Sequence, residues 1–342
     1  MPTASASALP RRFAAHLDQQ GWVAAGERIA VAVSGGSDSV ALLLLLRRYA
    51  EGRGLRLGVA HFHHGLRAEA EEDAAFAAAL ARRLALPFWL CRSHGLRGMA
   101  NLEAVARERR YRFFRRLLLG PSAVAQSVAT GHTADDQAET VLMRLLRGSG
   151  PPGLGAIRPV LVAGGGRVLR PLLPFHREEL QAWLGAEGEG WREDASNRDL
   201  RRLRNRIRHG LLPRLERDYN PRLRPRLAAL AELVQAEEEV WAQLTAEDSR
   251  LLSRVDGGRW RAETAQLAAL PLARLRRLLR RMATPGLAPD YAHLQAVVAA
   301  IRAAAGPAAP SRPRLFALGS AVIRITPRWV WRAPAGSPAA LY

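Results

Sequence analysis

The stretch Ile29-Ala30-Val31-Ala32-Val33-Ser34-Gly35-Gly36-Ser37-Asp38-Ser39 decides the fold of the first half of this sequence. An apolar, β-branched run ends at a Ser/Gly cluster, and the apolar run of residues 40–46 follows at once. This order predicts a buried strand, a tight turn and a helix N-terminus. Glycine permits positive φ and close backbone approach, and the N–H groups of a first helical turn bind anions. The turn is therefore a candidate phosphate site.

The turn has an ordinary interpretation, a Gly-rich strand–helix connection with a Ser or Asp cap. It is not a Walker loop, because the sequence contains no lysine, and it lacks the G-x-G-x-x-G of a dinucleotide site. Residues 34–39 resemble the S-G-G-x-D-S loop of the PP-loop ATP pyrophosphatases, which split ATP between its α and β phosphates. The resemblance implies that the following residues hold the leaving pyrophosphate: Ser34, Gly35, Gly36, Ser37 and Ser39.

The composition predicts a polyanionic partner. Among 342 residues there are 51 basic and 31 acidic ones, a formal net charge of +20, and every basic residue in that count is arginine. Arginine binds phosphate bidentately and stacks on bases, so nucleic acid is the first candidate. A GC-rich genome would explain the choice of arginine and alanine, but it does not explain the net excess of positive charge.

The single cysteine and the N-terminus limit the environment of the protein. Cys91 alone excludes an internal disulfide, a cysteine-based zinc site and an iron–sulfur cluster held by this chain. Residues 1–12 lack the apolar stretch of a signal peptide, and residues 42–46 are too few to span a bilayer. We expect a soluble, cytoplasmic protein with no membrane contact.

Strand and helix patterns alternate through the first 150 residues. Strands are predicted near 28–33, 55–62, 87–91 and 124–131, and helices near 11–24, 38–50, 69–86, 101–119 and 133–147. Such alternation is typical of an α/β fold with a doubly wound parallel sheet, whose ligands bind at the carboxyl ends of the strands. Residues 148–166 are rich in Gly and Pro, which predicts a mobile loop rather than another helix or strand. We expect this loop to close.

The rest of the sequence predicts three further parts. Residues 177–187 are helical, and residues 191–215 are dense in arginine. We expect a first domain over 1–215, a helical connector over 216–250 that contains a long helix at 221–250, and a smaller α+β domain over 251–342. In the last domain, helical runs at 262–283 and 290–304 precede a proline-rich break at 307–313 and two strands within 315–331.

Two clusters, one rich in histidine and one rich in arginine, are predicted to face the loop 34–39. Residues 61–67, His-Phe-His-His-Gly-Leu-Arg, follow the second strand. Three close histidines suggest a metal site, but the loop position and the lack of a cysteine partner favour a pocket for a nucleotide base. In residues 101–111, Arg107 and Arg110 lie three apart on one helical face, which fits a solvated basic face as well as an anion contact.

Two further clusters carry acids and arginines. His132, Asp136 and Glu139 are separated by four and three residues at a predicted strand–helix junction, so they can project into one site. Carboxylates at a helix start also fit as partners of the helix dipole. The polar turn of residues 194–197, followed by the basic residues 204–209, is typical of phosphate contact.

Together these motifs resemble a family within the PP-loop superfamily. Six motifs, S-G-G-x-D-S, H-G-L-R, N-L-E-A-x-A-R-x-x-R-Y, G-H-x-x-D-D-Q-x-E-T, R-P-L-L and D-x-S-N…R-N-x-I-R, follow in this order over about residues 25–215. This order resembles the tRNA(Ile)-lysidine synthetases. The residues after 215 are similar in placement to the smaller C-terminal domain of that family, and we expect this sequence to lack the additional domain of its longest members. His63 stands where the family usually has Asn or Asp.

The resemblance implies a two-step reaction on an isoleucine tRNA with a CAU anticodon. The C2 oxygen of the wobble cytidine attacks the α-phosphate of ATP and releases pyrophosphate, and the amine of free L-lysine then displaces AMP. The product, lysidine, pairs with A instead of G. We expect the cytidine to be flipped out of the anticodon stack, and a homodimer is an assembly compatible with the sequence.

The resemblance also implies a role for each motif. Asp38, with Asp136, would hold Mg²⁺ against the charge of the departing pyrophosphate. The residues expected to bind adenosine or its phosphates beyond the loop 34–39 are His61, His64 and Gly131. Those expected to bind lysine are Arg110, Asp136 and Glu139, with one carboxylate or His132 as the proton acceptor. The C-terminal domain and four residues, Asn197, Arg204, Arg206 and Arg208, would contact tRNA or phosphate.

Three other functions compete with this one. A tRNA thiolase of the 2-thiocytidine type shares the loop but needs cysteines that this sequence lacks. An arginine-rich RNA-binding protein with an inactive nucleotide site would retain the charge but not require Asp38, Asp136 and Glu139. A PP-loop synthetase acting on small molecules would not need a net charge of +20.

Overall fold

The computed structural model describes residues 4–65, 70–93, 95, 102–119, 124–163, 165–193, 199–255, 258–283, 291–318 and 321–334. The chain divides into two compact units, Met1–Gln235 and Ala236–Tyr342. Of the helices in these ranges, none is both long and apolar enough to span a bilayer.

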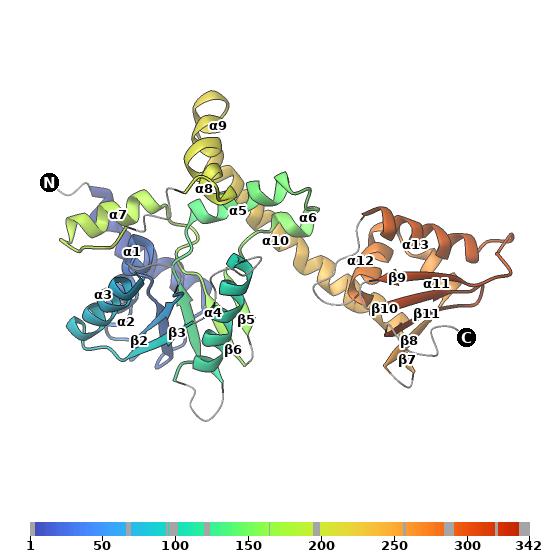
Figure 1. The fold of residues 1–342 in the computed structure, drawn as a ribbon, viewed down its shortest axis with the longest axis horizontal. Coiled ribbons are helices and arrows are strands. Elements are labelled where there is room, and N and C mark those ends of the chain that lie inside the picture. Colours follow the sequence, from blue (N-terminus) through green and yellow to red (C-terminus); the bar gives the residue numbers. More distant parts are fainter. Residues whose placement is uncertain are drawn as a thin grey trace. The chain divides into compact units, whose positions relative to one another are not determined.

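The first unit is built on a six-stranded sheet with the order β3-β2-β1-β4-β6-β5 (Figure 1). Five strands are parallel: β1 (Arg28–Ala32), β2 (Arg56–His63), β3 (Phe88–Arg92), β4 (Ser127–Thr130) and β6 (Gly166–Leu169). The edge strand β5 (Val160–Ala163) is antiparallel to β6. The predicted doubly wound α/β fold is confirmed, with this one antiparallel strand added.

Helices cover both faces of the sheet, which explains why its strands are almost continuously apolar. Ile29 and Val31 of β1 pack in one core with α1 (Ala4–Gln20), α2 (Ser37–Ala50), α3 (Ala70–Arg83) and α7 (Arg177–Ala186). Ala30, which points the other way, packs in a second core with α4 (Leu102–Leu118). The buried run of residues 29–33 is therefore the centre of a three-layer unit.

A third group of helices completes the first unit. α5 (Ala134–Leu146) follows β4, and its Leu142 packs with α8 (Leu203–Arg206), the π-helix Ile207–Leu211, α9 (Leu212–Asp218) and the start of α10 (Leu223–Asp248). This packing brings the arginine-dense residues after 200 onto the helix that carries Asp136 and Glu139.

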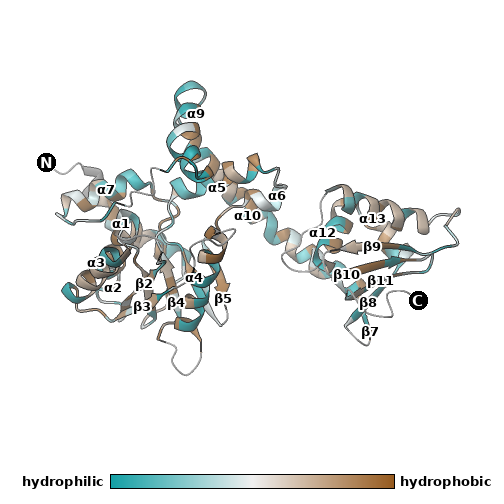
Figure 2. Ribbon diagram, in the orientation of Figure 1, coloured by the Kyte–Doolittle hydropathy of each residue, from teal (hydrophilic) through white to brown (hydrophobic). Residues whose placement is uncertain are grey.

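The prediction of a loop without elements at 148–166 is wrong. The segment contains a short helix, α6 (Pro151–Leu154), the strand β5 and the first residue of β6. Its glycines and prolines dominate the local signal and hide the antiparallel pairing of β5 with β6, the strand that follows it. β5 is an apolar edge strand (Figure 2), and 78% of Val162 is exposed.

The second unit is a five-stranded antiparallel sheet with the order β7-β8-β11-β10-β9. Its strands are β7 (Ser253–Val255), β8 (Arg259–Glu263), β9 (Arg314–Leu318), β10 (Ala321–Ile325) and β11 (Trp329–Pro334). α11 (Thr264–Ala269), α12 (Leu272–Met282) and α13 (Tyr291–Ala304) share one core with Ala262, Ile323 and Val330. The helices of this core therefore pack on one face of the sheet.

Two predictions for the second unit need correction. The continuous helix expected at 262–283 is divided, because residues 259–263 pair with β11 and Pro271 starts a new helix. Residues 314–334 form three strands rather than two, since β9, β10 and β11 pair in succession. The pairing of β8 with β11 joins residues distant in sequence, whereas β9, β10 and β11 pair with their neighbours along the chain.

Candidate active site

The loop between β1 and α2 has the conformation expected of an anion cradle. Gly35 has φ +98°, in the left-handed region that glycine adopts readily, and its carbonyl accepts a hydrogen bond from Arg192 N at 2.9 Å. Gly36 is the N-cap of α2. The first turn of α2 therefore opens at the carboxyl end of the central strand, where ligands bind in parallel α/β sheets.

The serines of this loop differ in what they do. Ser39 Oγ accepts a hydrogen bond from Ser34 N at 3.1 Å and donates one to Gly36 O at 2.9 Å, so it holds the loop closed. Ser37 Oγ lies 3.2 Å from Asp38 Oδ1 and accepts a hydrogen bond from Gln181 on α7. Ser39 therefore shapes the cradle, while Ser37 connects it to Asp38 and to α7.

Gly131 is required by packing rather than by its backbone angles. A Cβ at this position would lie 2.9 Å from Asp38 O and 3.1 Å from Ser39 N. The end of β4 therefore approaches the first turn of α2 as closely as only glycine allows.

A cavity of about 740 Å³ opens beside this loop, within the size range of small-molecule sites. It is lined by most of the residues that the sequence singled out: Ser34, Gly36, Ser37, Asp38, Ser39, His61, His64, Arg110, Gly131, His132, Asp136, Arg204 and Arg208. It is also lined by residues that the sequence analysis did not select, including Arg177, Gln181 and Arg192. The fold thus brings predicted residues from five segments, 34–39, 61–64, 110, 131–136 and 204–208, to one place.

Some predicted site residues do not line this cavity. Glu139 is buried behind Arg204 and Arg208, and Gly35 belongs to the loop without lining the cavity. Arg206 is exposed and is not among the lining residues. Asn197, the rest of residues 194–198, Leu66, Arg67 and Asn101 lie outside the described residues.

The floor of the cavity is a cluster of carboxylates and arginines. Arg204 Nε lies 2.7 Å from Glu139 Oε2, and its Nη2 lies 3.0 Å from Asp136 Oδ1. Arg208 Nη2 repeats the pattern, 3.0 Å from Glu139 Oε2 and 3.2 Å from Asp136 Oδ1. The two arginines expected to contact phosphate are thus paired with the two carboxylates expected to hold the lysine amine.

Arg177 connects this cluster to the phosphate loop. Its Nη2 lies 2.8 Å from Asp38 Oδ2 and 3.4 Å from Asp136 Oδ1, so the two carboxylates converge on one point. Arg177 begins α7, where a cation opposes the helix dipole. That unfavourable position was the signal in the sequence that could have marked Arg177 as a site residue.

The acidic residues of the site have opposite pKa shifts. Burial raises the pKa of Asp38, and the nearby charge of Arg177 only partly offsets this effect. Burial would also raise the pKa of Asp136, but Arg204, Arg177 and Arg208 outweigh it and hold that pKa far below its ordinary value. Asp136 is therefore firmly ionised, while Asp38 is the more basic of the two carboxylates.

Two further residues that line the cavity, His132 and Arg110, are largely desolvated. Burial lowers the pKa of His132 to about 3, so its imidazole is neutral at pH 7, and Thr130 Oγ1 lies 3.0 Å from its Nδ1. Burial also lowers the pKa of Arg110, with Arg107 and Arg170 adding to the effect. Arg110 Nε is buried without a hydrogen-bond partner, which makes this guanidinium a candidate binding site for an anionic group.

The three histidines after β2 have separate surroundings. His61 Nδ1 lies 2.8 Å from Val33 O, His63 Nε2 lies 3.2 Å from Glu71 Oε1, and His64 packs edge-on against Phe62. Within the described ranges, His, Cys, Asp and Glu side chains form no group of three or more that could hold a metal ion. A magnesium ion here would therefore need ligands from a substrate as well as from protein carboxylates.

Comparison with known proteins places this geometry in a family. Residues 7–215 match the family model described as a PP-loop domain. A tRNA(Ile)-lysidine synthase from Gloeobacter violaceus is 39% identical over 311 residues, which cover 89% of this chain and 90% of that protein. This chain belongs to the tRNA(Ile)-lysidine synthase family. All the residues that line the cavity lie within the matched residues 7–215.

Other tRNA(Ile)-lysidine synthases are longer than this chain. The one from Solibacter usitatus is 45% identical over 289 residues, 80% of this chain and 61% of that protein. The one from Geobacter sulfurreducens is 44% identical over 238 residues, and the match spans about half of its length (49%). Among solved structures, the U34-tRNA thiolase NcsA from Methanococcus maripaludis shares the fold, with a TM-score of 0.54 at 14% identity over 66% of this chain and 78% of that one.

Proposed function

We propose that this chain joins L-lysine to C2 of the wobble cytidine in a CAU-anticodon isoleucine tRNA, with ATP cleaved to AMP and pyrophosphate. The observation that carries the proposal is the convergence, in one cavity, of the phosphate loop 34–39 with the ionised Asp136, which shares Arg204 and Arg208 with Glu139 behind it. One half of the cavity suits a triphosphate, and the other half suits a substrate that carries a positive amine. The relatives named tRNA(Ile)-lysidine synthase support the same reaction.

In the first step, the C2 oxygen forms a bond to the α-phosphorus while the bond between the α-phosphorus and the bridging oxygen breaks. Backbone N–H groups of the α2 N-terminus and Ser37 Oγ would receive the charge that develops on pyrophosphate. The oxygens of Asp38 and Asp136, which both approach Arg177, fit the ligand preference of Mg²⁺. When bound there with ATP, Mg²⁺ would neutralise charge on the phosphates.

In the second step, the lysine Nε forms a bond to C2, the C2–O bond breaks, and AMP leaves with that oxygen. Asp136 and Glu139 would hold the lysine ammonium group. These carboxylates would then interact with the ammonium group as well as with Arg204 and Arg208. Arg110, buried with Nε unpaired, would bind the lysine carboxylate. The amine must lose a proton, and Asp38 is the most basic of the catalytic candidates, because the pKa values of Asp136 and His132 are both lowered.

The RNA must deliver its cytidine to this cavity. C2 is inaccessible in a stacked anticodon, so the nucleotide has to be flipped out of the stack. The net charge of +20 favours RNA binding in general, whereas Arg107 and Arg110 at the cavity are placed to meet phosphate or carboxylate.

The two steps can be separated experimentally. Purified chain, Mg²⁺, ATP labelled at the α-phosphate and a CAU-anticodon isoleucine tRNA transcript are incubated with and without L-lysine. We expect the label to stay on the RNA without lysine and to be released as AMP when lysine is added. A transcript with wobble guanosine in place of cytidine is the matched control. Labelled AMP that forms at the same rate without RNA would contradict the proposal.

A further inference from the structure

Arg177 contacts both of the carboxylates that the proposed function assigns to Mg²⁺. Its Nε lies 2.9 Å from Asp38 Oδ2, and its Nη2 lies 2.8 Å from the same oxygen and 3.4 Å from Asp136 Oδ1. The three residues come from three different helices, with Arg177 on α7, Asp38 on α2 and Asp136 on α5. The guanidinium of Arg177 therefore lies at the point where the two carboxylates converge.

The backbone of Arg177 is held separately from its side chain. Arg177 N donates a hydrogen bond to Asp135 Oδ2 at 2.8 Å, and Ala134 N donates one to Phe175 O at 2.9 Å. These two bonds tie the start of α7 to the start of α5. Further along α7, Leu180 is fully buried in the core. Rotation of the Arg177 side chain can therefore move the guanidinium to another partner while α7 stays in place.

A cation bound to both carboxylates would compete with this guanidinium for the same oxygens. Both oxygens of Asp38 accept hydrogen bonds from Arg177 Nε, at 3.3 and 2.9 Å. Of the two Asp136 oxygens, Oδ1 contacts Arg177, whereas Oδ2 accepts hydrogen bonds from Thr133 N and Oγ1. Mg²⁺ binds carboxylate oxygens at about 2.1 Å, and its charge repels a guanidinium on those oxygens. Arg177 in its present position therefore opposes the binding of Mg²⁺ between Asp38 and Asp136.

The ion pairs around this point balance one another. Three carboxylates and three guanidinium groups form the cluster: Asp38, Asp136, Glu139, Arg177, Arg204 and Arg208. If Mg²⁺ bound here by itself, Arg177 would lose its carboxylate partners although its side chain is only 23% exposed, which is unfavourable for a charged group. Arg177 also lines the cavity that holds the phosphate loop, so the phosphates of ATP would offer it new acceptors. The arrangement therefore favours the binding of Mg²⁺ together with ATP over the binding of Mg²⁺ alone.

We propose that Arg177 couples the binding of Mg²⁺ at Asp38 and Asp136 to the binding of ATP. Without the nucleotide, the guanidinium holds the two carboxylates together and keeps the affinity of the chain for a divalent cation low. With the nucleotide, the guanidinium donates to the phosphates, and the carboxylate oxygens become available to the ion. The proposal rests on the proposed function for the identity of the nucleotide and of the metal.

Metal binding is measured on the full chain without RNA or lysine. The probe is Mn²⁺, which takes the same oxygen ligands as Mg²⁺ and whose free-ion EPR signal falls on binding. Arg177→Gln should lower the Kd for Mn²⁺ alone by about tenfold, because the carboxylates lose a competing positive charge. Arg177→Lys keeps that charge and should bind Mn²⁺ as weakly as the parent. The matched control is Arg48→Gln, since Arg48 joins α2 to α7 through Glu187 without lining the cavity, and it should bind Mn²⁺ like the parent.

The affinity for the nucleotide should change in the opposite direction. In the presence of Mg²⁺, the Kd for an ATP analogue with a methylene group between its α and β phosphates should rise about tenfold in Arg177→Gln, which loses a donor to phosphate. A purely structural role for Arg177 would instead weaken the binding of both Mn²⁺ and the analogue. If Arg177→Gln melts early, the rise of its melting temperature with added Mn²⁺ provides the measurement, and this rise should exceed that of the parent.

The outcomes separate this proposal from the proposed function. Mn²⁺ bound by Arg177→Gln no more tightly than by the parent would overturn the coupling. If the parent then still forms lysidine, the proposed function stands without it. If the parent forms no lysidine while Arg177→Gln binds Mn²⁺ more tightly and the analogue more weakly, the proposed function fails and the coupling stands.

Discussion

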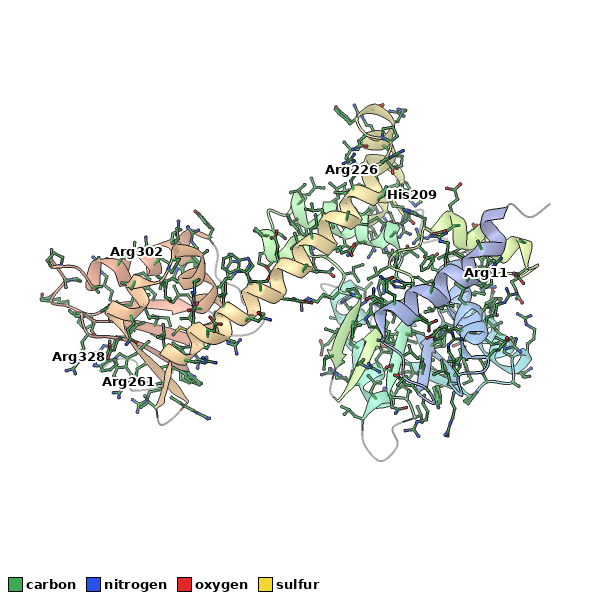
Figure 3. All side chains as sticks on the ribbon, turned by 180° about the vertical axis from the view of Figure 1, so that it is seen from behind. Arg11, His209, Arg226, Arg261, Arg302 and Arg328 are labelled. Atoms are coloured by element: carbon green, nitrogen blue, oxygen red, sulfur yellow. The ribbon has the colours of Figure 1, made fainter. Side chains whose placement is uncertain are left out.

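Arginine has two different arrangements in this protein, one in the cavity and one beside Trp329 in the second unit. In the cavity, Arg177, Arg204 and Arg208 are paired with Asp38, Asp136 and Glu139. In the second unit, Arg261 and Arg328 lie against the indole of Trp329 without a carboxylate partner among the described residues (Figure 3). The paired set holds charged groups in a defined geometry in the cavity, whereas the second set is held by contacts with indole rings.

The strongest test of the paired set is Asp38→Ala, which removes the carboxylate between the phosphate loop and Arg177. We expect adenylation to be abolished, a loss of more than about a thousandfold, because the Mg²⁺ that would neutralise the charge on the phosphates loses a carboxylate ligand. Pyrophosphate release from ATP with CAU-anticodon tRNA is the measurement. Asp38→Asn keeps the shape of the side chain and should be nearly as inactive. Near-normal release in Asp38→Ala would remove Asp38 from the reaction.

Glu139→Gln tests whether the cavity floor binds the amine of lysine. The amide keeps the shape but not the charge, so we expect the KM for lysine to rise by roughly tenfold or more while adenylation stays measurable. Glu139→Ala should in addition destabilise the first unit by about 3 kcal/mol, because Arg204 and Arg208 lose a buried partner. An unchanged dependence on lysine in both variants would exclude Glu139 from the amine site.

Gly131→Ala tests the close approach of β4 to the phosphate loop. The added methyl group would lie 2.9 Å from Asp38 O, so we expect a loss of about 1–3 kcal/mol in the free energy of unfolding and a higher KM for ATP. The matched control is Gly185→Ala in α7, where no atom lies within 4 Å of the new Cβ. That variant should be as stable as the parent or slightly more so. If the two variants have the same free energy of unfolding and the same KM for ATP, the close approach of β4 to the phosphate loop is not required.

The smallest expected effect concerns the arginines beside Trp329. Arg261→Gln removes a cation–π contact and should lower the free energy of unfolding by about 0.5–1 kcal/mol. Arg204→Gln in the cavity should lower it more, since Arg204 is paired with the buried Asp136 and Glu139. Unfolding in urea measures both variants. A larger loss of stability for Arg261→Gln than for Arg204→Gln would reverse the distinction.

The parts of the fold that local patterns determine were predictable from the sequence. The run of residues 29–33, the glycines after it and the apolar start of α2 gave the central strand, the turn and the helix in order. β5 was missed because the glycines and prolines around it dominate the local signal, although its partner β6 follows it directly. β8 was missed because its partner β11 is distant in sequence. Pro271 is a local signal, and it marks where the predicted long helix divides.

The site likewise combines features that local spacing predicts with contacts that it does not predict. Motif spacing predicted that His132, Asp136 and Glu139 would project into one site, and the family resemblance added Asp38. His132, Asp136 and Asp38 line one cavity, whereas Glu139 is buried behind Arg204 and Arg208. Motif spacing did not predict that Arg177 would join Asp38 to Asp136, or that Arg204 and Arg208 would pair with Glu139, because these contacts span 41 to 139 residues. Spacing along one helix identifies neighbours on that helix, whereas ion pairs between elements depend on the packing of the whole unit.

The most direct test of the central claim is analysis of the nucleosides after reaction. The chain is incubated with Mg²⁺, ATP, isotopically labelled L-lysine and the CAU-anticodon isoleucine tRNA transcript, and the RNA is digested and analysed by mass spectrometry. The proposed function predicts a labelled cytidine derivative at the wobble position, with one AMP and one pyrophosphate released for each lysine incorporated. ATP cleaved to AMP without lysine in the RNA, or tRNA bound with ATP left intact, would contradict it.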